Sequence, residues 1–310
     1  MNSMIYIRTH YVNHTIEELF DLWSQVLPGR VRLLIDETAG VHDAGTMPKV
    51  SYSLDTLAAM GLPDLPKGKA MWHAGDYTMA ALAPIMEPDE FAIVVENDAV
   101  PVLHDIEGWR DIVSQLAEGE IAFLNFNRRN PEWFWRNNLD AIYHKDEIWG
   151  CFMMVMGFTQ LTAKRMTARR RQIADEIAKG LHTQWPHVEP FVATEAKRMA
   201  LRLVDLDRLI PDLNQTCKVS DPYWWYAQPK GIARNTILHP VMQDRGRFLN
   251  KIENMIGRKL KVEYIASRLA PVLPLSPAEH TRFTGLVKEH LLLDSLDPIL
   301  KPANTASSTN

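Results

Sequence analysis

The feature that most constrains the fold is an apolar run at residues 91–95 that is followed directly by Glu96, Asn97 and Asp98. Such a run predicts a buried β-strand that ends where the chain turns towards solvent. Because side chains alternate along an extended chain, Glu96 and Asp98 point to the same side. Carboxylate oxygens so spaced suit Mg²⁺ or Mn²⁺, and a polar strand end before a turn is the alternative interpretation.

Strands and helices alternate along the first half of the chain. Strands are predicted at 4–7, 31–35, 91–95 and 121–126, and helices at 16–26, 76–86 and 106–116. The β-α-β order favours a mainly parallel sheet flanked by helices, with 91–95 as a central strand. Ligands of such sheets bind beyond the carboxyl ends of the strands, where Thr9 and Asp36 lie.

Composition excludes several classes of protein. The length of 310 residues allows one large α/β domain with an appendage, and a formal net charge of −4 argues against nucleic-acid binding by the whole surface. Cys151 and Cys217 form no C-x-x-C pair, so neither a disulfide framework nor a structural zinc site is expected. With no targeting segment at the N-terminus and no apolar run long enough to span a bilayer, we expect a cytoplasmic protein.

The chain lacks the glycine-rich loops that bind phosphate through backbone amides. A bound diphosphate would therefore need a cation, held by Glu96, Asp98 and a third ligand. His239 is a candidate, since imidazole binds Mn²⁺ and Pro240 stiffens its loop. A lone histidine is more often a surface or capping residue.

Two segments are rich in basic residues. The predicted helix at 161–181 carries the basic residues Lys164, Arg165, Arg169, Arg170 and Arg171, for which a solvated face is the default interpretation and contact with phosphate or an anionic surface the alternative. The amphipathic segment 245–265 is expected to pack on the preceding domain, with peripheral contact to an anionic membrane or a partner as the alternative. The tail at 301–310 is expected to be disordered.

An ordered set of short motifs carries a family resemblance. It comprises WHAGDY at 72–77, END at 96–98, Trp109, HVEPFVAT at 187–194, and His239-Pro240. This set resembles GT-A-type glycosyltransferases, and more specifically bacterial nucleotide-diphospho-sugar transferase-like proteins, over residues 4–242. The resemblance implies a GT-A-like, Rossmann-like catalytic domain at 1–243, a helical basic extension at 244–300 and a disordered tail.

The resemblance also implies roles for individual residues. Asp98 would be the direct metal ligand and a catalytic residue, Glu96 would contact metal-bound water or the donor ribose, and His239 would be the C-terminal metal ligand. The motif departs from D-x-D in its first position, because Glu96 has a longer side chain. Donor-binding residues would be Thr9, Asp36, Asp76, Glu96 and Asn97.

Glu189 lies where the family places the acidic residue that serves as base or positions the acceptor. A base in an inverting displacement needs a pKa suited to taking a proton from a hydroxyl group. In a retaining mechanism Glu189 would only orient the acceptor. The alternative interpretation is a carboxylate that interacts with a helix dipole, since residues 193–200 look helical.

Two aromatic clusters, at 133–135 and 223–226, suit the apolar face of a sugar ring. Adjacent rings cannot all face one core, so at least one ring in each cluster is expected to be exposed or to line a cleft. Trp224, Trp225 and His187 are the predicted acceptor-binding residues.

The leading hypothesis is a metal-dependent glycosyltransferase in polysaccharide biosynthesis. It would use Mn²⁺ or Mg²⁺ to move a sugar from a nucleotide-sugar donor, with a UDP-sugar favoured, to a cell-surface glycan or glycolipid, at the inner face of the membrane or in the cytoplasm. A nucleotidyltransferase is one alternative, although residues 8–14 lack its glycine-rich loop. A non-catalytic glycan-binding or scaffold protein is the other.

Overall fold

The computed structural model describes residues 2–63, 73–130, 132–139, 142–210, 212–218, 221–227, 232 and 234–300. Two of the sequence predictions lie outside the described residues: the role of Trp72 in the first motif and the disorder of the tail at 301–310.

The chain divides into two compact units. The first comprises Met1–Asn97, Leu103–Asn214 and Arg234–Thr236, and the second comprises Asp98–Val102, Gln215–Ala233 and Ile237–Asn310. The segment Asp98–Val102, which lies within the sequence of the first unit, thus belongs to the second unit. The main part of the second unit begins at Gln215, before residue 244. The assignment of a catalytic domain and an extension stays a prediction.

A seven-stranded sheet forms the centre of the first unit, in the order β3-β2-β1-β4-β7-β6-β8. The strands are β1 (Asn2–Thr9), β2 (Val31–Asp36), β3 (Lys49–Tyr52), β4 (Glu90–Glu96), β6 (Ile121–Arg128), β7 (Trp149–Thr159) and β8 (Leu203–Asp205). Only β7 runs antiparallel to its neighbours. The prediction of a mixed, mainly parallel sheet with residues 91–95 in its middle is confirmed.

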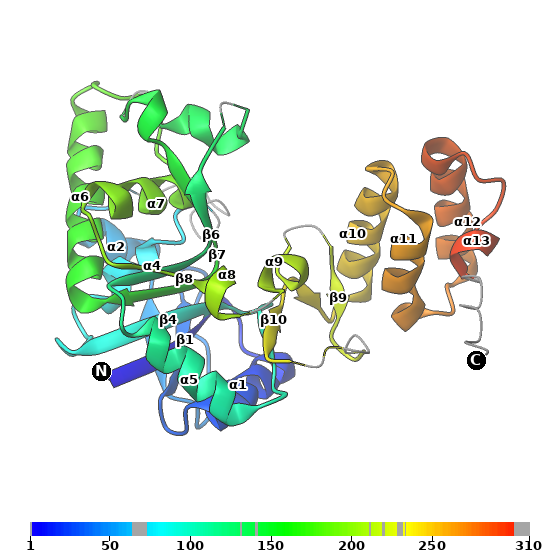
Figure 1. Ribbon diagram of the computed structural model, residues 1–310, viewed down its shortest axis with the longest axis horizontal. Coiled ribbons are helices and arrows are strands. Elements are labelled where there is room, and N and C mark those ends of the chain that lie inside the picture. The colour runs from blue at the N-terminus through cyan, green and yellow to red at the C-terminus, as the bar shows by residue number, and fades with distance from the viewer. Residues whose placement is uncertain are drawn as a thin grey trace. The chain divides into compact units, whose positions relative to one another are not determined.

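Helices flank this sheet, as predicted. They are α1 (His14–Val26), α2 (Leu54–Ala59), α4 (Tyr77–Leu82), α5 (Ile106–Leu116), α6 (Gln160–Ala178), α7 (Val188–Arg198) and α8 (Leu206–Leu209), with the short 3₁₀ helices η1 (Phe134–Asn138) and η2 (Lys145–Glu147). Figure 1 shows α1 and α5 along one face of the sheet and α4, α6 and α7 along the other.

The helix α1 illustrates how the local sequence sets these elements. The Asn13 side chain accepts a hydrogen bond from the backbone N–H of Ile16 and so caps the first turn. One face of the helix is buried, and its Trp23 ring packs edge-on against Trp109 of α5, with ring centroids 5.4 Å apart. The motif residue Trp109 is therefore part of the core.

The central strand β4 packs closely against β7. Gly157 of β7 pairs with Ile93 of β4, and a Cβ atom at position 157 would lie 2.6 Å from Cε1 of Phe91. A side chain at position 157 would therefore collide with a fully buried ring. The close packing fixes β4, whose carboxyl end carries Glu96.

The second unit combines short strands with helices. The strands are β5 (Val100–Val102), β9 (Tyr223–Trp224), β10 (Thr236–Leu238) and β11 (Val241–Met242), in the pairs β10-β5 and β11-β9. The helices are α10 (Arg245–Gly257), α11 (Val262–Leu269), α12 (Pro277–Leu286) and α13 (Asp297–Leu300), with η3 (Ala270–Val272) and η4 (Val287–Leu291), while α9 (Leu213–Thr216) lies at the boundary of the units.

The helices α10 to α13 have a hydrophobic core of their own. Phe248, Ile252, Leu269 and Phe283 are among its fully buried residues. The apolar face predicted for 245–265 is thus buried within the second unit, and contact with a membrane surface stays a prediction. Among the described residues, no helix combines the length and the apolar character needed to cross a membrane.

Candidate active site

The carboxyl end of the central strand carries the predicted metal ligands. Glu96 is the last residue of β4, and Asn97 and Asp98 form the turn that leads to β5. The backbone of the second unit brings His239 to Asp98: Val241 N–H donates to the Asp98 carbonyl oxygen at 2.9 Å, and His239 N–H donates to that of Thr216 at 3.0 Å. Residues that are far apart in the sequence are thereby fixed side by side.

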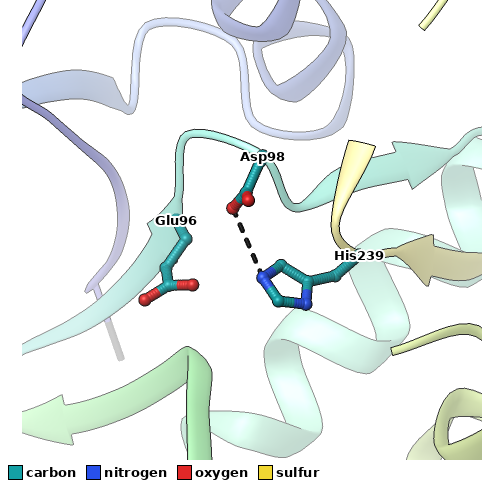
Figure 2. Close-up of side chains that lie close together, drawn as sticks. All are labelled: Glu96, Asp98 and His239. Carbon is teal, nitrogen blue, oxygen red and sulfur yellow. Dashed lines mark ion pairs between the residues drawn. The ribbon is translucent and has the colours of Figure 1, made fainter. Parts of the chain in front are cut away.

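Figure 2 shows the Asp98 and His239 side chains directed at each other, with Nε2 of His239 3.4 Å from Oδ1 of Asp98. Glu96, Asp98 and His239 each offer one ligand atom, and these atoms lie within 4.8 Å of one another. Asp98 and His239 belong to the same unit, and only Asn97 separates Glu96 from Asp98 along the chain. All three predicted metal ligands therefore come together.

The second ring nitrogen of His239 fixes its tautomer. Nδ1 lies 3.2 Å from the backbone carbonyl oxygen of Lys218. A carbonyl oxygen only accepts hydrogen bonds, so Nδ1 carries a proton, and Nε2 is the ring nitrogen that faces Asp98. Histidines that bind metals have this arrangement, in which the other ring nitrogen donates to a carbonyl or carboxylate. The two carboxylates suit Mn²⁺ or Mg²⁺, and an imidazole ligand favours Mn²⁺ over Mg²⁺.

Arg8 contacts the Glu96 carboxylate, a pairing that the sequence did not predict. Nη2 of Arg8 hydrogen-bonds to Oε1 of Glu96, because β1 and β4 are neighbours whose register places Arg8 opposite Glu96. The guanidinium is largely buried and balances the charge of the carboxylate. From the sequence, Arg8 could be placed only at the end of a strand, because the sequence does not show which strands are neighbours in the sheet.

Glu189 lies in the first turn of α7, where the alternative interpretation expected a helix-terminal carboxylate. Its backbone N–H donates to Nδ1 of the capping residue His187 at 3.3 Å. The pKa of Glu189 is raised to about 8, chiefly by burial; the charge of Arg129 lowers it and that of Glu96 raises it. The carboxyl group therefore titrates in a range suited to proton transfer.

Thr9, Asp36 and Asn97 lie along the edge formed by the carboxyl ends of β1, β2 and β4. The Thr9 hydroxyl donates to the carbonyl oxygen of Tyr11 at 2.7 Å, and the Asp36 carboxylate accepts from Thr38 N–H at 2.9 Å. These predicted donor-binding residues thus share one edge of the sheet, which is where ligands of open α/β sheets bind.

Asp76 is engaged inside the protein. Its two carboxylate oxygens accept from Nε and Nη2 of Arg170 at 2.7 and 2.8 Å, and both side chains are almost fully buried. The guanidinium also lies over the Phe191 ring, 3.7 Å from its centroid. The geometry does not support donor binding by Asp76. The expectation of a solvated face on the basic helix is wrong for Arg170, because a buried carboxylate pairs with it.

His187, a predicted acceptor-binding residue, is only 3% exposed. Its ring stacks on Trp135 with centroids 3.9 Å apart, and the His73 ring packs against it edge-on. Burial, followed by the positive charges of His73 and Arg170, lowers the pKa of His187 to about 3. A neutral ring so enclosed packs inside the first unit and caps α7, and it presents no exposed surface for stacking on a sugar.

The aromatic clusters each expose one ring, as predicted: Phe134 is 73% and Tyr226 is 66% exposed. Trp224, a predicted acceptor-binding residue, is half-buried and packs on Phe248, with ring centroids 5.3 Å apart. Trp225 is also half-buried. Trp224 thus contributes to the core of the second unit, and Tyr226 is the more accessible ring.

No family model matches this chain, and no curated protein is significantly similar to it. The function is therefore argued from the site. Two carboxylates and an imidazole can hold a divalent cation, and Glu189 can exchange a proton near neutral pH.

Proposed function

We propose that this protein is a metal-dependent glycosyltransferase that uses a nucleotide-diphosphate sugar, with a UDP-sugar favoured. The observation that carries the proposal is the contact between Asp98 and His239, with the His239 tautomer set for metal binding, directly after the central strand. The mainly parallel sheet is compatible with the GT-A form of the α/β fold, and the ligand position agrees with binding beyond the carboxyl ends of the strands.

Asp98, His239 and Glu96 would hold Mn²⁺ or Mg²⁺. The cation would balance the negative charge that develops on the leaving nucleoside diphosphate when the sugar–phosphate bond breaks. Arg8 holds Glu96 in place through their hydrogen bond and adds a positive charge at the same edge of the sheet. Thr9, Asp36 and Asn97 would contact the donor along that edge.

Glu189 would act on the acceptor. Its carboxylate form accepts the proton of the attacking hydroxyl group in an inverting displacement, and the raised pKa makes it a stronger base than an ordinary carboxylate. In a retaining reaction the same residue would position the acceptor by hydrogen bonding. The acceptor class is a cell-surface glycan or glycolipid, and the exposed rings of Phe134 and Tyr226 suit the apolar face of a sugar.

A thermal-shift experiment with the full chain tests the metal site. UDP, GDP and CDP are added with and without Mn²⁺ to the wild type, to Asp98→Asn and to the control Asp89→Asn, whose exposed carboxylate lies before β4. We expect one nucleotide to raise the melting temperature only with Mn²⁺, in the wild type and the control but not in Asp98→Asn.

The donor sugar is then identified by metal-dependent hydrolysis of the matching nucleotide sugars. If no nucleotide stabilises the wild type in either condition, the proposal is overturned in favour of a glycan-binding protein. Stabilisation that persists in Asp98→Asn would instead place nucleotide binding away from this site.

A further inference from the structure

Arg129 directly follows β6, at the sheet edge where β4 also ends, since β4 and β6 both run antiparallel to β7. Its guanidinium lies over the Trp133 ring at 4.7 Å and near the Phe152 ring at 5.5 Å from the centroids. Nη2 donates to the backbone carbonyl oxygen of Asn125 at 3.0 Å. Two aromatic rings and a backbone contact thus hold the group in one orientation.

The guanidinium of Arg129 keeps an unpaired donor inside the protein. Among the residues that the structure describes, its buried Nε has no hydrogen-bond partner, and no carboxylate hydrogen-bonds to the guanidinium. Burial lowers the pKa of Arg129, while the negative charges of Cys151 and Glu189 in their ionised forms act in the opposite direction. A partly buried cation with an unpaired donor costs free energy, and a binding role would account for that cost.

Gly150 of β7 leaves the space for this arrangement. A Cβ atom at position 150 would lie 2.6 Å from Cη2 of Trp133 and would also collide with Nε of Arg129. The stacked pair is therefore built against bare backbone, and any larger residue at position 150 would displace it. This dependence distinguishes Arg129 from a surface arginine such as Arg128, which is exposed and lies 3.4 Å from Asp146.

From this geometry we infer that Arg129 forms a subsite, close to Glu189, that binds a carboxylate or phosphate group carried by the acceptor. The inference rests on the proposed function, because Glu189 is there the residue that acts on the acceptor. A planar guanidinium suits an oxyanion, to which its Nη groups can donate hydrogen bonds. The protonated form of Glu189 does not repel such an anion, and the charge of Arg129 offsets that of the carboxylate form which acts as base.

The test measures anion binding without metal or nucleotide. Full-length protein in EDTA is titrated with sodium glucuronate or inorganic phosphate, and its melting temperature is compared with that in glucose or sodium chloride at equal ionic strength. We expect at least one anion to stabilise the wild type, with about tenfold weaker apparent affinity in Arg129→Gln and no change in the control Arg128→Gln. Preference for glucuronate or phosphate names the acceptor group.

The inference would be overturned if neither anion stabilised the wild type, or if the Arg129→Gln variant kept the affinity of the wild type. It would also be overturned if this variant lost Mn²⁺–UDP binding to an equal degree, because Arg129 would then be assigned to the donor. If Arg129→Gln does not fold, Arg129→Lys replaces it, and an affinity equal to that of the wild type then counts against the subsite. Since no metal or nucleotide is present, anion binding can succeed even if the proposed transferase activity fails.

Discussion

At the scale of the residue, the proposed role of His239 as a metal ligand depends on one contact at each of its two ring nitrogens. Nδ1 is held by the Lys218 carbonyl oxygen while Nε2 faces Asp98. We expect His239→Gln to weaken Mn²⁺ binding about tenfold to a hundredfold, because it removes an imidazole ligand whose orientation is fixed. Titration followed by electron paramagnetic resonance of free Mn²⁺ measures this, with the exposed His14→Gln as control. Equal affinity in both variants would remove His239 from the site.

Glu189 should make the activity depend on pH. Because its pKa is raised to about 8, the carboxylate that accepts a proton becomes more abundant as pH increases from 6 to 9. We expect kcat/KM of the transfer reaction to increase through this range and to level off above it. In Glu189→Gln the rate should fall by about a hundredfold or more and lose this pH dependence. A wild-type profile that is flat between pH 6 and 9 would contradict the role of Glu189 as base.

The same carboxyl group should also affect stability. Its pKa is higher in the folded than in the unfolded chain, so the folded state binds more protons between about pH 4.5 and 8, and stability falls as pH rises through that window. Between pH 5 and pH 8, we expect the free energy of unfolding to decrease less in Glu189→Gln than in the wild type, with a difference on the order of 1 kcal/mol. Urea unfolding at pH 5 and pH 8 compares the two, with Glu118→Gln as an exposed control.

At the scale of the element, the Arg170–Asp76 pair joins α6 to the start of α4. Removing one partner leaves a buried charge uncompensated, so Arg170→Met should lower the free energy of unfolding by about 3–5 kcal/mol. The double variant Arg170→Met with Asp76→Leu should recover much of that loss, because no charge is then buried. Urea unfolding measures both, beside the exposed control Lys164→Met. A double variant no more stable than the single one would show that the pair does more than neutralise charge.

Four strands of the sheet and its longer helices could be predicted from the sequence, because they follow from the local spacing of apolar residues, whereas β3, β7 and β8 were not predicted. The contacts between residues of different elements could not be predicted. Arg170 was expected in solvent because the carboxylate that buries it is 94 positions away, and the pairing of Arg8 with Glu96 depends on β1 lying beside β4. The approach of Asp98 to His239 was expected from the need for a third metal ligand and from the family resemblance. The proton on Nδ1 of His239 was not expected, since it depends on a backbone carbonyl of Lys218.

At the scale of the whole molecule, the two units have separate hydrophobic cores. Phe248 is fully buried in the second core, so Phe248→Ala should destabilise that unit by about 3–5 kcal/mol. Hydrogen exchange followed by mass spectrometry should then show faster exchange in peptides from 245–300, whereas Phe123→Ala should act on the sheet of the first unit. Faster exchange throughout the chain in both variants would mean that the units unfold as one.

The segment Asp98–Val102, which joins the second unit from within the first, has a consequence for synthesis on the ribosome. β5 is made well before its partner β10, and Asp98 well before His239. The two can meet only after the chain as far as β11 has left the exit tunnel, and closing so long a loop adds an entropic cost. A nascent chain that stops before residue 236 would carry Glu96 and Asp98 without the histidine, so the proposed three-ligand metal site could form only after that point.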